Sequence, residues 1–377
     1  MNIYEKLGLK RIINAGGTFS SVGGSILSQE TIEAMADASK YFVDMNALNA
    51  TAGRVIADLI GAEAALVTSG AAAGLALAVA ACITRDDIWK MRQLPNTEEI
   101  RRNQVIVQRA HLIPYEQIIR MSGAKIVEVG NVTYTNAEEL DSAISDKTAA
   151  IVYIESHECI KRAELSTQEV VEIAKKHGVP TILDAAAELP PISNFRKWLD
   201  IGFDLVIYSG GKAIGGPNDT GFIYGNKDLV KCCAMQNSPN VFFGRPFKVS
   251  KEQIVGLMVA LRAYMSKNHN KELEIWNKKV AYLHNELKGT DGARVDIVFP
   301  DETGLPVPRV MITLNETVLK TTAAKVIQEL KDGNPSIVTR HFDQKAGIIK
   351  LDVMCLEDGE EIEVAKRLKE KLRFREN

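Results

Sequence analysis

The chain has no long apolar run, few cysteines and few histidines. No stretch of about 18 apolar residues is present, and the first residues, MNIYEKLGLK, lack the apolar core of a signal peptide. The 5 cysteines show no CxxC spacing and the 6 histidines no HExxH spacing. We therefore expect a cytoplasmic protein without a membrane span, a disulfide framework or a metal site.

An excess of basic charge is also absent. The chain has 46 lysines and arginines against 48 acidic residues, a net charge of −2. Such a chain lacks the positive field that holds a nucleic acid or an anionic membrane, so we expect a small-molecule substrate instead. The length of 377 residues and the hydrophobic content of 46% allow two or three domains.

The middle of the chain alternates short β-branched runs with helical patterns. The expected strands are 63–69, 104–108, 125–130, 149–156, 181–186 and 204–209. They lack polar alternation and helical patterns separate them, which predicts a mostly parallel sheet covered on both faces. The fold class is therefore α/β, with a large doubly wound domain that we place at residues 46–250.

Residues 251–377 follow another pattern, which predicts a smaller α+β domain. A long amphipathic helix over 251–289, with one possible break at KNHN, precedes alternating strands and a charged helix over 358–374. The Gly-rich residues 1–45 are expected to pack on this domain or to cross an interface. Polar residues 85–104 are either a solvated helical excursion or a lid or arm that reaches a neighbouring subunit.

Three features fall at the carboxyl ends of the expected strands, where parallel sheets bind ligands. In TSGAAAG, at 68–74, small residues open a helix, and the free N–H groups of such a start suit a phosphate. A buried Ala-rich helix would have the same pattern. The segment has neither the GK[ST] of a Walker loop nor the GxGxxG of a dinucleotide fingerprint.

The other two features are an aspartate and a lysine. Asp184 ends the apolar strand of TILDAAAELPP, where it either caps the next segment or faces a buried cation. Lys212 lies in YSGGKAIGGPND between two Gly pairs. A lysine of an ordinary loop needs no such glycines, which indicate a tight backbone path that turns the amine inward. A desolvated lysine loses basicity and becomes a nucleophile.

Together, these features match the needs of pyridoxal 5′-phosphate. That cofactor requires a lysine for a Schiff base, a carboxylate for the pyridine nitrogen and a cradle for the phosphate. Asp184 precedes Lys212 by 28 residues, which leaves room for one βα unit, and Ser209 could add a hydroxyl to the phosphate site. The alternative from a different functional class is a protein that binds pyridoxal phosphate but catalyses no reaction.

Most of the chain resembles the fold-type I pyridoxal-phosphate enzymes. Within them it is most similar to the branch that contains bacterial selenocysteine synthase and D-glucosaminate-6-phosphate ammonia-lyase. The resemblance lies in RIINAGGT, AGRVIADLIGAEAALVTSGAAAGLALA, SGAKIVEVG, SGGKAIGGPNDTG and PSIVTRHFDQKAGIIKLDV. It implies the transferase fold, with a large domain and a small one, and a homodimer or larger homo-oligomer.

The resemblance also implies residue roles. Lys212 is the Schiff-base lysine, Asp184 the partner of the pyridine nitrogen, and His111 the candidate ring against the cofactor, with a structural histidine as the alternative. The other expected cofactor contacts are Ser69, Gly70, Ala71, Ser156, Ser209 and Thr220, the last toward the phosphate of a partner subunit. The expected substrate contacts are Arg109, His157, Arg245, Lys248 and Arg340, of which Arg340 would bind a carboxylate.

Some departures separate the chain from selenocysteine synthase. That enzyme has an additional N-terminal domain for its transfer RNA, whereas the shared core here begins almost at Met1, so no such domain is expected. Gly211 replaces an acidic residue before the lysine, and the segment after Arg109 also differs. With the balanced charge, these features favour the ammonia-lyase branch.

The expected reaction is therefore a pyridoxal-phosphate-dependent α,β-elimination, with Lys212 as general base. The best candidate is conversion of D-glucosaminate 6-phosphate to 2-keto-3-deoxy-6-phosphogluconate and ammonia. The alternatives are selenium transfer on seryl-tRNA and another pyridoxal-dependent lyase or aldolase.

Overall fold

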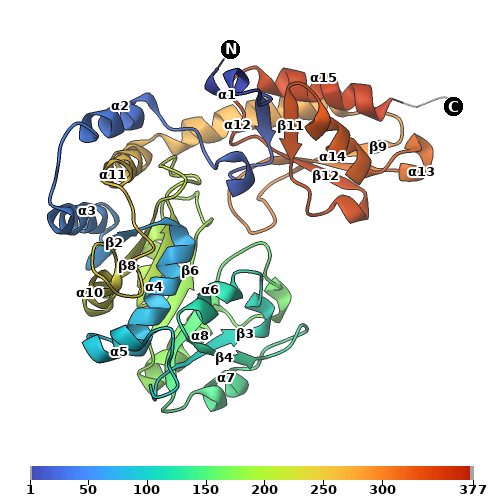
Figure 1. Cartoon of the computed structure of the whole chain (residues 1–377). Helices are drawn as coiled ribbons and strands as arrows, with labels where there is room; N and C mark the ends of the chain where they lie inside the picture. Colours follow the sequence, from blue (N-terminus) through green and yellow to red (C-terminus); the bar gives the residue numbers. More distant parts are fainter. Residues whose placement is uncertain (1, 374–377) are drawn as a thin grey trace. The chain divides into compact units, whose positions relative to one another are not determined.

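The computed structural model describes residues 2–373 and divides into two compact units (Figure 1). The large unit is Ser25–Lys267, and the small unit joins the residues up to Gly24 to those from Asn268 onward. These bounds differ from the expected 45/46 and 250/251. The reason is that helix α11 (Lys251–Ser266) packs against α2 (Gln29–Ala38) and α3 (Met45–Ile60), which places all of them in the large unit.

The large unit is built on a seven-stranded sheet with the order β2-β8-β7-β6-β5-β3-β4. Its strands are β2 (Ala64–Thr68), β3 (Gln104–Gln108), β4 (Lys125–Val129), β5 (Thr148–Ile154), β6 (Thr181–Asp184), β7 (Leu205–Ser209) and β8 (Gly221–Gly225). Neighbours from β7 to β4 are parallel, and β8 is antiparallel to both β7 and β2. The expected mostly parallel sheet is confirmed, and β8 is the strand that the sequence pattern missed.

Helices cover both faces of this sheet, as a doubly wound fold requires (Figure 1). Besides α2, α3 and α11 they are α4 (Gly70–Thr84), α5 (Ile88–Gln93), α6 (Glu116–Met121), α7 (Ala137–Ala143), α8 (Thr167–His177), α9 (Asn194–Ile201) and α10 (Lys227–Gln236). One core contains side chains of α3, α8 and α9, and the other contains side chains of α4, α6 and α10. Helix α4 is buried from Ala73 to Thr84, which explains why its residues are small or apolar on every side.

Local signals fix several helix ends. A capping box of Ser166 and Glu169 starts α8, and Gly178 ends it in the left-handed region at φ 63°. The expected break in the long C-terminal helix is confirmed at Lys267 and Asn268, where the side chain of Asn268 accepts a hydrogen bond from the Lys271 N–H.

The small unit has its own core between two sheets and several helices. Its strands are β1 (Ile12–Ala15), β9 (Ala293–Val298), β10 (Arg309–Leu314), β11 (Ser336–Thr339) and β12 (Ile348–Asp352). Its helices are α1 (Ile3–Lys6), α12 (His269–Leu287), α13 (Glu316–Leu319), α14 (Ala323–Asp332) and α15 (Glu360–Leu372). Strands β12, β10 and β9 form an antiparallel sheet, while β1 pairs in parallel with β11. In Figure 1, this pairing puts the blue start of the chain beside the red-orange strand β11.

The polar insertion over 85–104 is anchored to the core of the large unit. Met91 of α5 and Ile100 are both buried, so the segment is not a free solvated excursion. A role as a lid or arm stays a prediction. Within residues 2–373, no helix is long and apolar enough to cross a membrane.

A glycine in α3 tests the packing of this helix on the sheet. A Cβ atom at Gly53 would collide with the Ala65 carbonyl oxygen of β2. Gly53→Ala should therefore lower the free energy of unfolding by about 1–3 kcal/mol, although alanine has a higher helix propensity than glycine. Gly256→Ala in α11 is the matched control, since its Cβ would meet the flexible Met35 side chain at 2.7 Å. Urea unfolding measures both, and equal losses for the two variants would contradict this packing.

Candidate active site

The turn that carries Lys212 is packed so tightly that side chains are excluded at the two glycines before the lysine. A Cβ atom at Gly210 would collide with the Thr220 side chain, and one at Gly211 with the Asn218 backbone. The Gly210 N–H donates to the Thr220 carbonyl at 2.8 Å, and the Gly216 N–H donates to the Gly210 carbonyl at 2.8 Å. The glycines thus serve a close backbone approach, as the sequence indicated.

Lys212 and Asp184 influence each other's charge at the carboxyl edge of the sheet. Burial lowers the pKa of Lys212, against the charges of Asp184, Glu188 and Glu158, which raise it. Burial raises the pKa of Asp184, against the Ala186 N–H, which donates to its Oδ1 at 3.0 Å, and against the charge of Lys212. The lysine is therefore less basic than a surface lysine, and a carboxylate lies near its amine.

The start of α4 lies at the same edge of the sheet. Strand β2 runs in the direction of β6 and β7, because β8 is antiparallel to both of its neighbours. Ser69 makes no side-chain capping bond to α4, and a Cβ atom at Gly70 would meet nothing within 4 Å. The helix start therefore has no side-chain cap and has free space beside Gly70, and both features suit a phosphate.

The lysine turn and the start of α4 are in direct contact. A Cβ atom at Gly221, the first residue of β8, would lie 2.6 Å from the Gly70 carbonyl carbon and 2.7 Å from the Ala71 nitrogen. Because Gly221 directly follows the lysine turn, the turn and the helix start are held in fixed register. A lysine, a partly buried carboxylate and a helix start with only small side chains thus meet at one edge, and these residues fit pyridoxal phosphate.

The serines predicted at this edge lie at strand ends. Ser209 ends β7 and pairs with Gly221. Ser156 follows β5, and its hydroxyl accepts a hydrogen bond from the Glu158 N–H at 3.2 Å. The Glu155 N–H donates to the Asp184 carbonyl at 2.9 Å, which keeps this loop and its partly buried His157 beside β6. The roles of these residues toward a ligand stay predictions.

His111 has the environment of a structural histidine and not of a ring open to a cofactor. Its side chain is fully buried, and its ring meets that of Tyr153 edge-on at 4.4 Å. Nδ1 accepts from the Ile154 N–H at 3.3 Å, so the proton is on Nε2, which donates to Glu164 at 2.9 Å. Burial raises the pKa of Glu164, but the bond from His111 and the charge of Lys161 bring it below its usual value.

Arg109 and Thr220 have partners within the chain. Arg109 forms a partly exposed ion pair with Glu128 at 3.2 Å, and Glu128 is on β4, on the side of β3 away from Asp184. Thr220 is fully buried, and its hydroxyl donates to the Pro217 carbonyl at 2.7 Å. Thr220 therefore supports the lysine turn, and its contact with the phosphate of a partner subunit stays a prediction.

The remaining basic candidates lie elsewhere in their units. Arg245 and Lys248 are exposed on the segment between α10 and α11, and their contact with a substrate stays a prediction. Arg340 follows β11 in the small unit, where its Nη2 forms an ion pair with Glu302 at 3.1 Å.

Sequence reasoning missed three residues around the lysine. Glu188 is buried, and its charge raises the pKa of Lys212. Its position in the apolar stretch AAAELPP was a usable signal, because a buried carboxylate needs a partner. Burial and the charges of Glu158 and Asp184, two of the carboxylates that act on Lys212, raise the pKa of Tyr115. Ser25 donates to the Gly211 carbonyl at 3.1 Å, and no local pattern announces this contact.

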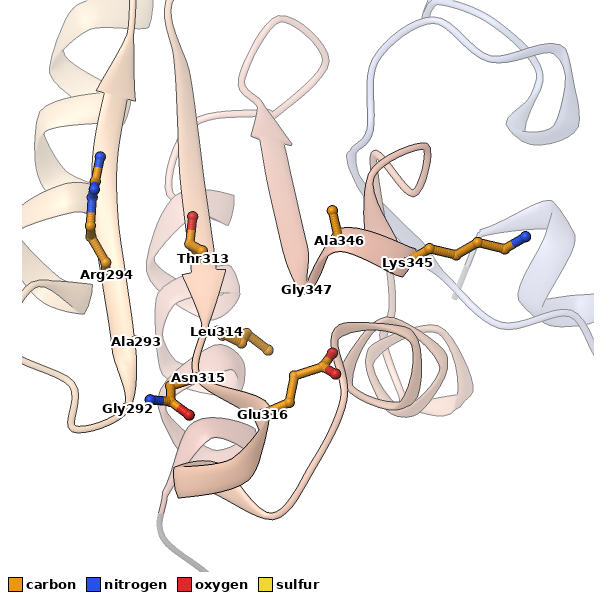
Figure 2. Close-up of a pocket in the computed structure, with 10 residues that line it drawn as sticks. All are labelled: Gly292, Ala293, Arg294, Thr313, Leu314, Asn315, Glu316, Lys345, Ala346 and Gly347. Atoms are coloured by element: carbon orange, nitrogen blue, oxygen red, sulfur yellow. The ribbon is translucent and has the colours of Figure 1, made fainter.

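An open recess in the small unit is separate from every predicted site residue. It has a volume of about 690 Å³ and lies where β9, β10 and the turn before β12 come together (Figure 2). Its lining residues are Gly292, Ala293, Arg294, Thr313, Leu314, Asn315, Glu316, Lys345, Ala346 and Gly347. Arg294 is already engaged, because its Nε donates to Asp296 at 2.7 Å.

Comparison with known proteins places the chain in one family. The family model described as SelA, L-seryl-tRNA selenium transferase, matches residues 12–288. The chain is 34% identical to the D-glucosaminate-6-phosphate ammonia lyase of Salmonella typhimurium over 98% of its own length and 97% of the relative's. A solved structure of a D-glucosaminate-6-phosphate ammonia-lyase superposes with a TM-score of 0.86, at 34% identity, over 99% of this chain and 98% of the other.

A second relative has a different named activity. The chain is 36% identical to the 5′-C-glycyluridine monooxygenase-decarboxylase of a Streptomyces species, over 98% of its own length and 92% of the relative's. Identity at this level therefore accompanies more than one reaction, and the substrate has to be argued separately.

The buried hydroxyl of Thr220 offers a test of the lysine turn. Thr220→Val keeps the side-chain volume but removes the bond to Pro217, whereas Thr220→Ser keeps the bond. We expect the valine variant to hold the cofactor less tightly, by about 5- to 30-fold, because the Pro217 carbonyl then keeps only the bond from the backbone N–H of residue 220, at 2.9 Å, and the serine variant to stay closer to the parent. Equilibrium dialysis of the cofactor measures this, and equal binding by all three proteins would show that Thr220 does not support the turn.

Proposed function

We propose that this chain, which belongs to the L-seryl-tRNA selenium transferase family and is a pyridoxal-phosphate-dependent enzyme, acts as an ammonia-lyase on D-glucosaminate 6-phosphate. The products would be 2-keto-3-deoxy-6-phosphogluconate and ammonia. The observation that carries the proposal is the near full-length match to an ammonia lyase with this substrate, in a chain whose Asp184 ends β6 and whose Lys212 follows the neighbouring strand β7.

Lys212 is the residue that would hold the cofactor covalently and then serve as general base. Because burial lowers the pKa of Lys212, its Nζ exists in the neutral form at lower pH than a surface lysine. A neutral amine at this place can take the proton from Cα of an amino acid. When bound, the cofactor withdraws electrons from that Cα and so makes the proton removable.

Asp184 and the start of α4 would fix the orientation of the cofactor. The carboxylate of Asp184 would keep a proton on the pyridine nitrogen, and Ser69, Gly70 and Ala71 would receive the phosphate. Asp184 is suited to this task because the Ala186 N–H holds its Oδ1 in place at 3.0 Å.

The chemistry balances without an oxidant. The substrate loses the Cα proton and the Cβ hydroxyl, which together make one water molecule. The resulting enamine tautomerises to an imine, in which Cβ gains one proton and the nitrogen loses one, and one water molecule hydrolyses the imine to the 2-keto acid and ammonia. Arg340 is proposed to bind the carboxylate, and Arg245 or Lys248 the distal phosphate.

Two other reactions would use the same fold. The Streptomyces relative, by its name, is a monooxygenase and decarboxylase, so a chain with that activity would consume oxygen and release carbon dioxide. Selenium transfer would require a seryl-tRNA, and the net charge of −2 offers no general attraction for one. The homo-oligomer that the resemblance implies stays a prediction.

The direct test is release of 2-keto acid and ammonia from D-glucosaminate 6-phosphate by the cofactor-loaded protein. Lys212→Ala should lower the rate by about 10²–10⁴-fold or more and should also lose the cofactor that borohydride would fix to the protein. Lys231→Ala, at an exposed lysine of α10, is the control and should retain both properties.

The outcomes separate the candidates. Oxygen uptake and carbon dioxide release from 5′-C-glycyluridine, without keto acid from the sugar acid, would contradict the ammonia-lyase assignment and favour the other reaction. Full activity of Lys212→Ala would remove the lysine from the mechanism.

A further inference from the structure

A group of cations and carboxylates surrounds Arg340 in the small unit. We call it the arginine cluster; it contains Arg309, Arg340 and Lys350 together with Asp301, Glu302, Asp343 and Asp352. Arg340 and Lys350 face each other across an antiparallel bridge, in which the Arg340 N–H donates to the Lys350 carbonyl at 3.1 Å.

The two arginines are paired in different ways. Arg309 contacts two buried carboxylates, Asp301 at 2.9 Å and Asp352 at 3.0 Å. Arg340 is 7% exposed, and its only close carboxylate among the described residues is Glu302 at 3.1 Å, since Asp352 lies 3.8 Å away. The Nε of Arg340 has no hydrogen-bond partner among the residues that the structure describes. Arg340 therefore has unused capacity to bind a carboxylate.

Glu302 differs from the other carboxylates of the arginine cluster. Its side chain is 28% exposed, whereas those of Asp301 and Asp352 are almost completely buried. It contacts Arg309 and Arg340 and lies 3.9 Å from Lys350. Burial raises the pKa of Glu302, but the charges of Arg309, Arg340 and Lys350 bring it to about 2, so Glu302 is an anion at any working pH.

The arginine cluster has four carboxylates for three cations, and Glu302 is the carboxylate that a ligand could replace. Asp301, Asp343 and Asp352 already balance the three cations, and Glu302 adds a fourth negative charge. A carboxylate from a ligand could take the place of Glu302 without changing the net charge of the arginine cluster. Such an exchange avoids the large cost of leaving a buried guanidinium unpaired.

The start of the chain closes one side of this cluster. Gly17, at φ 98°, leaves so little room that a Cβ atom there would lie 3.3 Å from the Asp352 Oδ2. The Cζ of Arg340 lies 5.7 Å from the Phe19 ring centre and 5.5 Å from that of Phe342. The segment INAGGTF thus helps to desolvate Arg340, which strengthens its interaction with an anion.

We propose that Glu302 occupies the place of a ligand carboxylate on Arg340 and is displaced when the amino acid substrate binds. Glu302 is therefore a residue that sets the affinity for the substrate, because binding must first break its ion pairs with Arg309 and Arg340. This inference rests on the proposed function only in naming the ligand, since every amino acid has the carboxylate.

The test is binding of two carboxylates that lack an amine, D-glycerate and D-gluconate 6-phosphate, to the cofactor-loaded full chain by calorimetry. Glu302→Gln should bind both about tenfold more tightly than the parent, because the competing anion is gone. Asp296→Asn is the matched control: it removes one negative charge from the same unit, at the Arg294 pair, and should leave affinity unchanged. The gain should vanish in the double variant Glu302→Gln with Arg340→Lys.

A purely structural Glu302 gives the opposite result. Glu302→Gln should then lower the unfolding temperature and weaken binding together, whereas displacement predicts a less stable free protein that binds more tightly. Unchanged or weaker binding, or a gain that persists in the double variant, would overturn the inference. If Glu302→Gln does not fold, Glu302→Asp gives the same direction, because its shorter side chain cannot span both arginines. If both ligands gain affinity but D-gluconate 6-phosphate never binds more tightly than D-glycerate, in the parent or in any variant, the role of Glu302 is upheld. The proposed substrate, with its distal phosphate, is then contradicted.

Discussion

The close approach of three backbone segments at one sheet edge is the constraint on which the candidate site depends. Gly210 and Gly211 lie against Thr220 and Asn218, and Gly221 lies against the first peptide of α4. No side chain fits at these contacts, so the lysine turn, the start of β8 and the start of α4 form one rigid edge. Lys212 can therefore be held at a fixed place relative to the helix start that would receive a phosphate, which covalent catalysis with a bound cofactor requires.

Opposing electrostatic effects then set the state of the lysine. Burial favours the neutral amine of Lys212, and the charges of Asp184, Glu188 and Glu158 favour the ammonium. The net result is a lowered pKa, which suits both a nucleophile and a general base. The arginine cluster of the small unit shows the same two effects with the opposite result, because the carboxylates around Arg309 outweigh its burial and raise its pKa.

The fold and the centre of the site follow from local patterns, whereas the roles of individual side chains do not. Apolar runs predicted the strands, and the glycines around Lys212 predicted a tight turn, because both signals act over a few residues. His111 looked like a candidate ring, but its partner Glu164 is 53 residues away, and no short-range pattern shows that pair. The pair of Arg109 with Glu128 on the neighbouring strand, and the bond from Thr220 to the turn, were likewise invisible to a local pattern, and the ligand roles of both residues stay predictions. The strand β8 was missed because its five residues, GFIYG, begin and end in glycine.

The central claim is that Asp184 and Lys212 face each other closely enough to shift each other's charge. The most direct measurement is the pH dependence of Lys212 labelling by an amine-reactive reagent in cofactor-free protein, followed by mass spectrometry. Because the charge of Asp184 raises the pKa of Lys212, Asp184→Asn should move the midpoint of labelling to a lower pH. An unchanged or higher midpoint would show that the two residues do not interact and would contradict this account of the site.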